Sequence, residues 1–165
     1  MATLEDLQNR LEALEDLAAI QALKARYGRL ADDRYGESAE EKERLAAEIS
    51  ELFTEDAVWD ADGVACAKGR SEIRKLFASP KHRFAIHFFK MIDINVNKDE
   101  ATASWFYFMP ATKKDDTAVW QSGREDELYV KINNKWMIKS LKMTLFFHTA
   151  YDDAGWGKKP VISYD

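Results

Sequence analysis

The hydrophobic periodicity of this chain changes once, near residue 83, and this change limits the folds open to it. Before that point, apolar residues recur every three or four positions, as they do on one face of a helix. After it, long segments rich in β-branched and aromatic residues alternate with short polar turns, which is typical of antiparallel strands. Helices followed by a long antiparallel sheet predict an α+β fold, with the N-terminal helices packed on one face of the sheet.

The N-terminal segment predicts a long helix over about residues 3–33, with a bend near Gly28. Thr3 is a suitable N-cap, and acidic residues follow it in the first turn. Four leucines share a spacing of three and four residues: Leu4, Leu7, Leu11 and Leu14. Because the helix is longer than most helices of globular proteins, its first turns either project and pack on a partner subunit or form a frayed amphipathic end.

Two shorter helices and a short strand are expected before the sheet. Ser38 can cap a helix over residues 38–53, and residues 57–59 read as a strand. A third helix is expected over residues 69–78, capped by Ser71 and ended by Pro80.

The second half of the chain predicts a meander of four long strands. Turn-like residues separate these segments, which lie at 83–96, 101–111, 118–132 and 135–149. They exceed the usual strand length of about 5–6 residues, so the sheet must be strongly curved. We therefore expect residues 1–165 to form a single domain, a cone-shaped α+β barrel whose open mouth is a pocket.

The composition excludes several classes of partner. The formal net charge is −5, whereas nucleic-acid binding usually needs a basic face. No stretch approaches the roughly 18–20 consecutive apolar residues of a membrane span. Cys66 is the only cysteine, which suits a reducing compartment and excludes an intrachain disulfide. We therefore expect a cytoplasmic protein that binds neither nucleic acid nor membrane.

The chain resembles the SnoaL-like branch of the nuclear transport factor 2-like superfamily over about residues 15–145. The segments that carry the resemblance occur in this order: AIQALKARYGRLADD, LFTEDAVWDADG, KGRSEIRKLF, IHFFKMIDINV and GREDELYVKINNKWMI. Members of this family include cofactor-free lyases, isomerases and cyclases, and also proteins that only bind. The resemblance therefore implies the cone-shaped fold more strongly than it implies a reaction.

Three residues match positions at which enzymes of this family carry their chemistry. The resemblance implies that His87 is the general base and that Asp32 orients its ring and stabilises the imidazolium. It also implies that Tyr27 polarises a carbonyl or protonates a leaving group. The alternatives are a buried core histidine within an apolar strand, a solvated helix end at Asp32, and a core aromatic at Tyr27.

One position departs from the dehydratase pattern of the family. Met109 lies near the place where related dehydratases have a second histidine or an aspartate, and methionine cannot transfer protons. The pattern is therefore closer to the single Asp–His pair of a dehydrochlorinase. Lys90 either extends to solvent or stabilises an oxyanion. Arg124 either orients an acidic or phenolic substrate or forms a cross-strand ion pair on the outer face.

The aromatic content exceeds what a small core needs, so we expect part of it to line a pocket for a planar ligand. The predicted substrate-binding residues are Lys90, Trp59, Phe89, Trp105, Tyr107, Met109, Trp120 and Arg124. His148 is a weaker second candidate for chemistry, and His82 is expected to be exposed and inert. The three histidines lack metal-ligand spacing, and no nucleotide-binding motif is present. We therefore expect neither a metal nor a cofactor.

The resulting hypothesis is a cofactor-independent lyase that acts on a hydrophobic, aromatic or polycyclic small molecule. The group eliminated is water, a halide or a small carbonyl fragment such as formaldehyde. Two alternatives remain open: an isomerase of the ketosteroid-isomerase type on the same scaffold, and a non-catalytic module for small-molecule binding or assembly. Long curved sheets with an exposed face tend to associate, so we also expect a homo-oligomer, either a dimer or a trimer.

Overall fold

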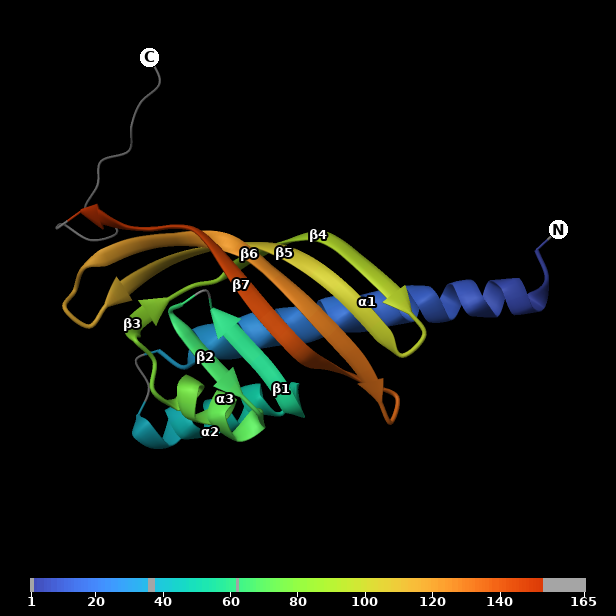
Figure 1. Cartoon of the computed structure of the whole chain (residues 1–165), viewed down its shortest axis with the longest axis horizontal. Helices are drawn as coiled ribbons and strands as arrows, with labels where there is room; N and C mark the ends of the chain where they lie inside the picture. The colour runs from blue at the N-terminus through green and yellow to red at the C-terminus, as the bar shows by residue number, and fades with distance from the viewer. Residues whose placement is uncertain (1, 36–37, 62, 153–165) are drawn as a thin grey trace, which may run out of the picture.

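The computed structural model describes residues 2–35, 38–61 and 63–152. A strongly curled sheet wraps around the long first helix, and two short helices cover the remaining side (Figure 1). The helices are α1 (Leu4–Asp33), α2 (Ala39–Ser50) and α3 (Arg70–Ala78). The strands are β1 (Phe53–Ala61), β2 (Ala65–Lys68), β3 (His82–Ala85), β4 (Phe88–Asn97), β5 (Glu100–Lys113), β6 (Ala118–Ile132) and β7 (Lys135–Asp152). The predicted α+β cone is confirmed.

The sheet contains one parallel pair, which the sequence did not predict. Its order is β2-β1-β7-β6-β5-β3, and β4 also pairs with β5. The pairs between β4 and β7 along the chain are antiparallel, as expected for a meander, whereas β1 runs parallel to β7. This parallel contact joins the first strand to the last, so it depends on residues that lie far apart in the sequence.

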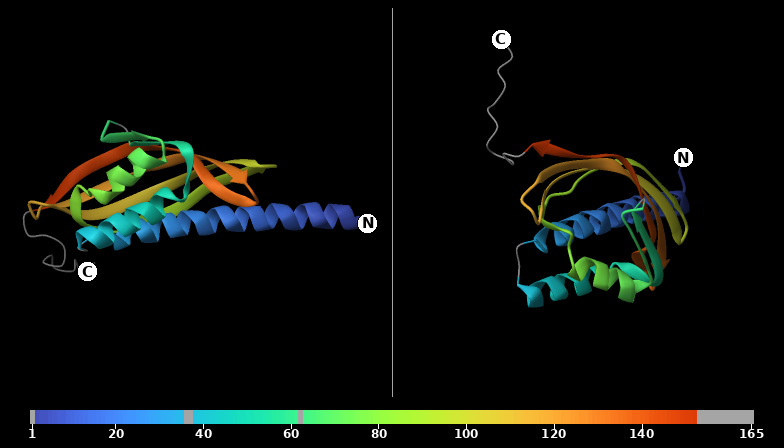
Figure 2. Two further views of the ribbon diagram at one scale, coloured as in Figure 1. Left: turned by 90° about the horizontal axis from the view of Figure 1, so that it is seen from below. Right: turned by 60° about the vertical axis from the view of Figure 1, so that its left-hand side comes forward.

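The first helix follows the predicted bounds and runs without interruption through Gly28. Thr3 forms a capping box with Asp6, which satisfies backbone donors at the helix start. The second half of α1 packs inside the curl through Ile20, Tyr27 and Leu30. The first half projects beyond the sheet (Figure 2).

The two short helices differ from expectation at their ends. The second helix is capped by Ser38 as predicted but ends at Ser50, because the next residues begin a nine-residue strand instead of the expected three-residue one. The third helix is capped by Gly69, whose φ of 84° suits glycine, and Ser71 lies inside the helix. Strand β2 was not predicted.

The first long strand of the prediction is divided into β3 and β4 by Ile86 and His87. Both parts pair with β5, where Ala85 lies opposite Ala111 and Phe88 lies opposite Phe108. Pro110 lies between these partners: its carbonyl accepts a hydrogen bond of 3.2 Å from the Ile86 N–H, but it has no N–H to donate in return, so the ladder is interrupted here. His87 therefore lies in a break between strands, and its backbone is free to bond elsewhere.

Alternate residues of the strands face the interior of the curl. In β5 the buried positions are the odd-numbered ones from Ala101 to Ala111, and in β6 they include Gln121, Glu125 and Glu127. The intervening side chains lie on the outer face of the sheet. Among the described residues, no helix is both long enough and apolar enough to cross a bilayer.

Candidate active site

Asp32 and His87 meet where the last turn of α1 approaches the break between β3 and β4. The Asp32 Oδ1 atom lies 2.6 Å from the His87 Nδ1 atom and also accepts a hydrogen bond of 3.0 Å from the His87 backbone N–H. The side chains are 25% and 13% exposed, so the pair is largely shielded from water. A carboxylate at a helix C-terminus opposes the helix dipole, and these two donors compensate for it.

This contact determines how the imidazole is protonated. When the ring is neutral, an Nδ1–H donated to the carboxylate leaves Nε2 as the basic nitrogen. The ring also stacks on Phe89, with centroids 5.8 Å apart and planes inclined by 14°. The carboxylate and the phenyl ring together limit rotation of the imidazole, so its free nitrogen has a defined direction.

His87 lines a half-open cavity of about 100 Å³. Apolar side chains from four elements contribute to the wall: Trp59, Phe77, Met109 and Met143. Gln121 adds an amide, which donates to the Tyr107 hydroxyl at 3.2 Å. The cavity is therefore mainly apolar, with His87 in its wall.

A second, more open groove of about 440 Å³ lies on the other side of the pair, between α1 and β4. His87 lines both hollows, whereas Asp32, Phe89 and Trp105 line this groove and not the cavity. Gly28 allows the two elements to approach closely, because a Cβ atom there would lie 3.1 Å from the Phe89 ring. The predicted pocket residue Phe89 therefore supports the Asp–His pair from the groove side, and Trp105 lines the same groove.

Tyr27 is fully packed and does not line the cavity. Its ring makes edge contacts with Phe53 and Phe77, and its hydroxyl accepts a hydrogen bond of 3.2 Å from the Trp59 indole. Burial, with a smaller contribution from the nearby Glu125 charge, raises the pKa of the Tyr27 phenol well above its usual value. The structure thus places Tyr27 behind Trp59, where it positions that indole.

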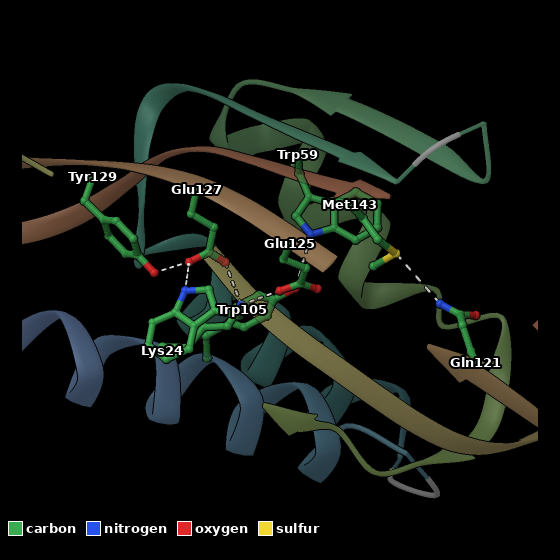
Figure 3. A network of polar contacts seen from close by, with 9 residues as sticks. Lys24, Trp59, Trp105, Gln121, Glu125, Glu127, Tyr129 and Met143 are labelled. Atoms are coloured by element: carbon green, nitrogen blue, oxygen red, sulfur yellow. Dashed lines mark hydrogen bonds and ion pairs between the residues drawn. The ribbon is translucent and has the colours of Figure 1, made fainter. Parts of the chain in front are cut away.

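A buried ionic network holds α1 against β6. Figure 3 shows Lys24 reaching toward Glu125 and Glu127, with Trp105 and Tyr129 beside them. The Lys24 ammonium lies 2.6 Å from the Glu127 carboxylate and also pairs with Glu125. The Trp105 indole donates to Glu127 at 3.0 Å, and the Tyr129 hydroxyl donates to the same oxygen.

The charges of this network depend on one another. Burial acts to lower the pKa of Lys24, but attraction from Glu125 and Glu127 outweighs it and raises that pKa. Burial raises the pKa of Glu127, and the lysine offsets only part of the effect. All three side chains are buried, so removing one partner leaves an uncompensated charge in the interior.

A family model described as a SnoaL-like domain matches residues 12–142 of the chain. The chain belongs to the SnoaL-like family. No curated protein matches it by sequence.

Three solved structures show where this SnoaL-like domain stands among known folds. A type 2 hexachlorocyclohexane dehydrochlorinase, LinA, has a TM-score of 0.78 and 16% identity, covering 92% of this chain and 99% of its own. An NTF2-like protein with a cystatin-like fold from Novosphingobium aromaticivorans has a TM-score of 0.74 and 28% identity, covering 88% and 92%. A scytalone dehydratase-like protein from the same organism has a TM-score of 0.72 and 19% identity, covering 85% and 90%.

Three predicted substrate-binding residues lie on the outer face of the SnoaL-like sheet, so these predictions are wrong for this geometry. Lys90 lies opposite Phe106, which in turn lies opposite Arg124, and all three are exposed. Arg124 forms an ion pair of 2.9 Å with Asp126 of the same strand, so the ion pair lies within β6 and does not cross to a neighbouring strand as the alternative had it. Trp120 packs on Phe108. The pleat of the sheet directs these side chains away from the cavity.

The remaining predicted positions divide between the wall and its support. Trp59 and Met109 line the cavity of this SnoaL-like domain, as expected. Tyr107 is buried and does not line the cavity, but its hydroxyl accepts a hydrogen bond from the Gln121 amide, which does. His148 lies opposite Gln121 near the end of β7 and is exposed.

Several polar wall residues were not predicted from the sequence, and two of them lie next to the Asp–His pair or its strand. Arg34 lines the cavity from the end of α1, and His82 lines it from the start of β3. His82 is partly buried, which corrects the expectation that it is exposed and inert. The position of Arg34 in the sequence could have indicated its place, because it directly follows the predicted helix end and is two residues from Asp32. Within the described ranges, no three His, Cys, Asp or Glu side chains gather to hold a metal ion.

Proposed function

We propose that this protein is a cofactor-independent lyase that acts on a small hydrophobic, aromatic molecule held in the half-open cavity. The observation that carries the proposal is the 2.6 Å contact between Asp32 Oδ1 and His87 Nδ1, with the His87 ring in the cavity wall. A base held by a carboxylate beside an apolar chamber is suited to proton abstraction. The structural similarity to a dehydrochlorinase and to a dehydratase-like protein supports the same class of reaction.

In the proposed reaction, Nε2 of His87 accepts a proton from a carbon or hydroxyl group of the substrate. The electron pair of the broken C–H bond forms a C=C bond while the bond to a leaving hydroxide or halide breaks. If the proton comes from a hydroxymethyl group, a C–C bond breaks and formaldehyde leaves. Asp32 stabilises the imidazolium that forms, and that imidazolium returns its proton to the product, the leaving group or water.

Turnover of three sets of aromatic compounds, each with a different leaving group, tests this proposal. The sets carry a benzylic halide, a β-hydroxyl group or a hydroxymethyl group next to an activated carbon. We expect one set to lose the mass of its leaving group in the presence of the wild-type protein. The His87→Gln variant should turn over that set at least about 100-fold more slowly, the usual scale for a lost general base.

The mass of the product decides between the candidate functions. A product of unchanged mass whose formation needs His87 would replace the lyase with an isomerase. Turnover that is equal in wild type and the His87→Gln variant would reject both reactions. Circular dichroism of the variant verifies that it folds, so that a loss of rate is not mistaken for a loss of structure.

We also propose that the protein self-associates. Leu4, Leu7, Leu11 and Leu14 lie on the projecting part of α1 and are 51–73% exposed. Their spacing of three and four residues is the seam of a coiled coil, so the same helix of a second copy is the proposed partner. In a parallel pair, Arg10 of one helix would face Glu15 of the other. A single domain over residues 1–165 and a cytoplasmic location remain part of this proposal.

A further inference from the structure

The guanidinium of Arg34 stands in the cavity wall with unused donors. Arg34 is the residue that ends α1, and its Nη2 donates a hydrogen bond of 2.8 Å to the Tyr35 hydroxyl. The central guanidinium carbon lies 4.8 Å from the centre of the Tyr35 ring and 4.6 Å from that of Phe77. The two rings hold the cation in place, so its donors keep a fixed direction.

The Nε and Nη1 atoms of Arg34 are buried and bond to no residue that the structure describes. Buried donors are nearly always satisfied, because water no longer solvates them and an unmade hydrogen bond costs free energy. An oxygen ligand that enters the cavity would remove this cost. A charged oxygen would do so most effectively, since hydrogen bonds between ions are stronger than neutral ones.

The charges around Arg34 favour an anion. Lys81 also lines the cavity, and none of the described lining residues is acidic. Burial, followed by the nearby His148, Arg34, His87 and Lys81, lowers the pKa of His82 to about 4. His82 is therefore uncharged near neutral pH, and Arg34 and Lys81 supply the positive charge of the wall, while the carboxylate of Asp32 lies behind the wall and is bonded to His87.

We propose that Arg34 binds the carboxylate of an aromatic monocarboxylic acid whose ring occupies the apolar part of the cavity. The void of about 100 Å³ suits a single ring between Trp59, Met109 and Met143. A ring held there lies beside His87, so Arg34 would orient the substrate relative to the base. This inference rests on the proposed function, because it assigns the substrate class of the same cavity.

Binding of benzoate and benzamide tests this assignment, because the two have nearly the same shape and differ in charge. Titration calorimetry measures both dissociation constants. We expect wild type to bind benzoate at least about tenfold more tightly than benzamide. The Arg34→Gln variant should lose this preference through weaker benzoate binding, with benzamide unchanged.

Two further variants separate the binding role from general effects. Arg26→Gln removes the same charge from an exposed position on α1 and should keep the preference. Arg34→Lys keeps the charge with fewer donors and should bind benzoate with intermediate affinity. It also replaces Arg34→Gln as the test if that variant does not fold.

The assignment is overturned if wild type binds both ligands equally, or if Arg34→Gln keeps the preference for benzoate. Because binding needs no turnover, the outcome is independent of the lyase reaction. Benzoate binding through Arg34 without any His87-dependent elimination would retain the carboxylate site and reject the proposed reaction. Elimination from neutral aromatic substrates only, with no preference for benzoate, would retain the proposed reaction and reject the carboxylate site.

Discussion

One oxygen of Asp32 accepts two hydrogen bonds from His87, one from the backbone N–H at 3.0 Å and one from Nδ1 at 2.6 Å. The first holds the strand break in place, and the second orients the ring. A single carboxylate thus fixes both the position of the residue and the tautomer of its side chain. Both the local fold and the proposed catalysis depend on this contact. A substitution of Asp32 that keeps the size of the side chain can therefore show whether catalysis is lost while the fold is retained.

Asp32→Asn should preserve the fold and abolish most activity. The amide oxygen can take the place of Oδ1 and accept both hydrogen bonds, but the side chain carries no negative charge to stabilise the imidazolium that forms during the reaction. We expect the turnover rate to fall by about 10²- to 10⁴-fold, with little change in the unfolding midpoint. The measurements are kcat on the substrate identified above and thermal unfolding followed by circular dichroism. Asp33→Asn, at the exposed neighbouring position, is the matched control and should retain activity.

Lys24→Met should destabilise the protein strongly, because it leaves Glu125 and Glu127 buried without their cation. The expected loss in the free energy of unfolding is about 3–5 kcal/mol, measured by urea denaturation. Lys75→Met, at an exposed position, should change stability by less than about 1 kcal/mol. Adding Glu125→Gln to Lys24→Met should recover part of the loss. Equal stabilities for Lys24→Met and Lys75→Met would mean that the network contributes no net stability.

His82 should make the protein less stable in mild acid. Its pKa in the folded protein is lowered from 6.5 to about 4, with Lys81, Arg34, His87 and His148 as the facing groups. Between these two pH values the unfolded chain binds more protons, so stability decreases as pH falls through this window. The His82→Gln variant should show a shallower decrease in the free energy of unfolding from pH 6.5 to 4.5. Parallel curves for the two proteins would contradict this origin of the acid sensitivity.

The leucine stripe on the projecting helix should control the oligomeric state. Replacing Leu7 and Leu11 together by Gln removes the apolar seam without adding charge, so the helix should no longer pair. We expect light scattering coupled to size-exclusion chromatography to report a smaller species for this variant than for wild type. The Glu5→Gln, Glu12→Gln pair lies outside the seam and serves as the control. A wild-type protein that is monomeric throughout would reject the proposed self-association.

The sequence alone was sufficient for features that depend on local physical chemistry. The bounds of α1 followed from the Thr3 cap and the leucine spacing, since both act within a few residues. The strands β5, β6 and β7 followed from β-branched and aromatic content between polar turns. The proximity of Asp32 and His87 was also anticipated, but through resemblance to a family and not through periodicity.

Only the tertiary structure decided which side chains face the cavity, because that depends on register between distant strands. Pro110 on β5 interrupts the ladder at Ile86 and His87, and this interruption divides a strand that is continuous in its hydrophobic pattern. The pleat then places Lys90 and Arg124 outside, although charge suggested a role for both within the pocket. The cation in the cavity wall is Arg34, because the residue that follows α1 lies beside the cavity. A contact between a helix end and a strand more than 50 residues away depends on tertiary packing, and no local sequence pattern encodes it.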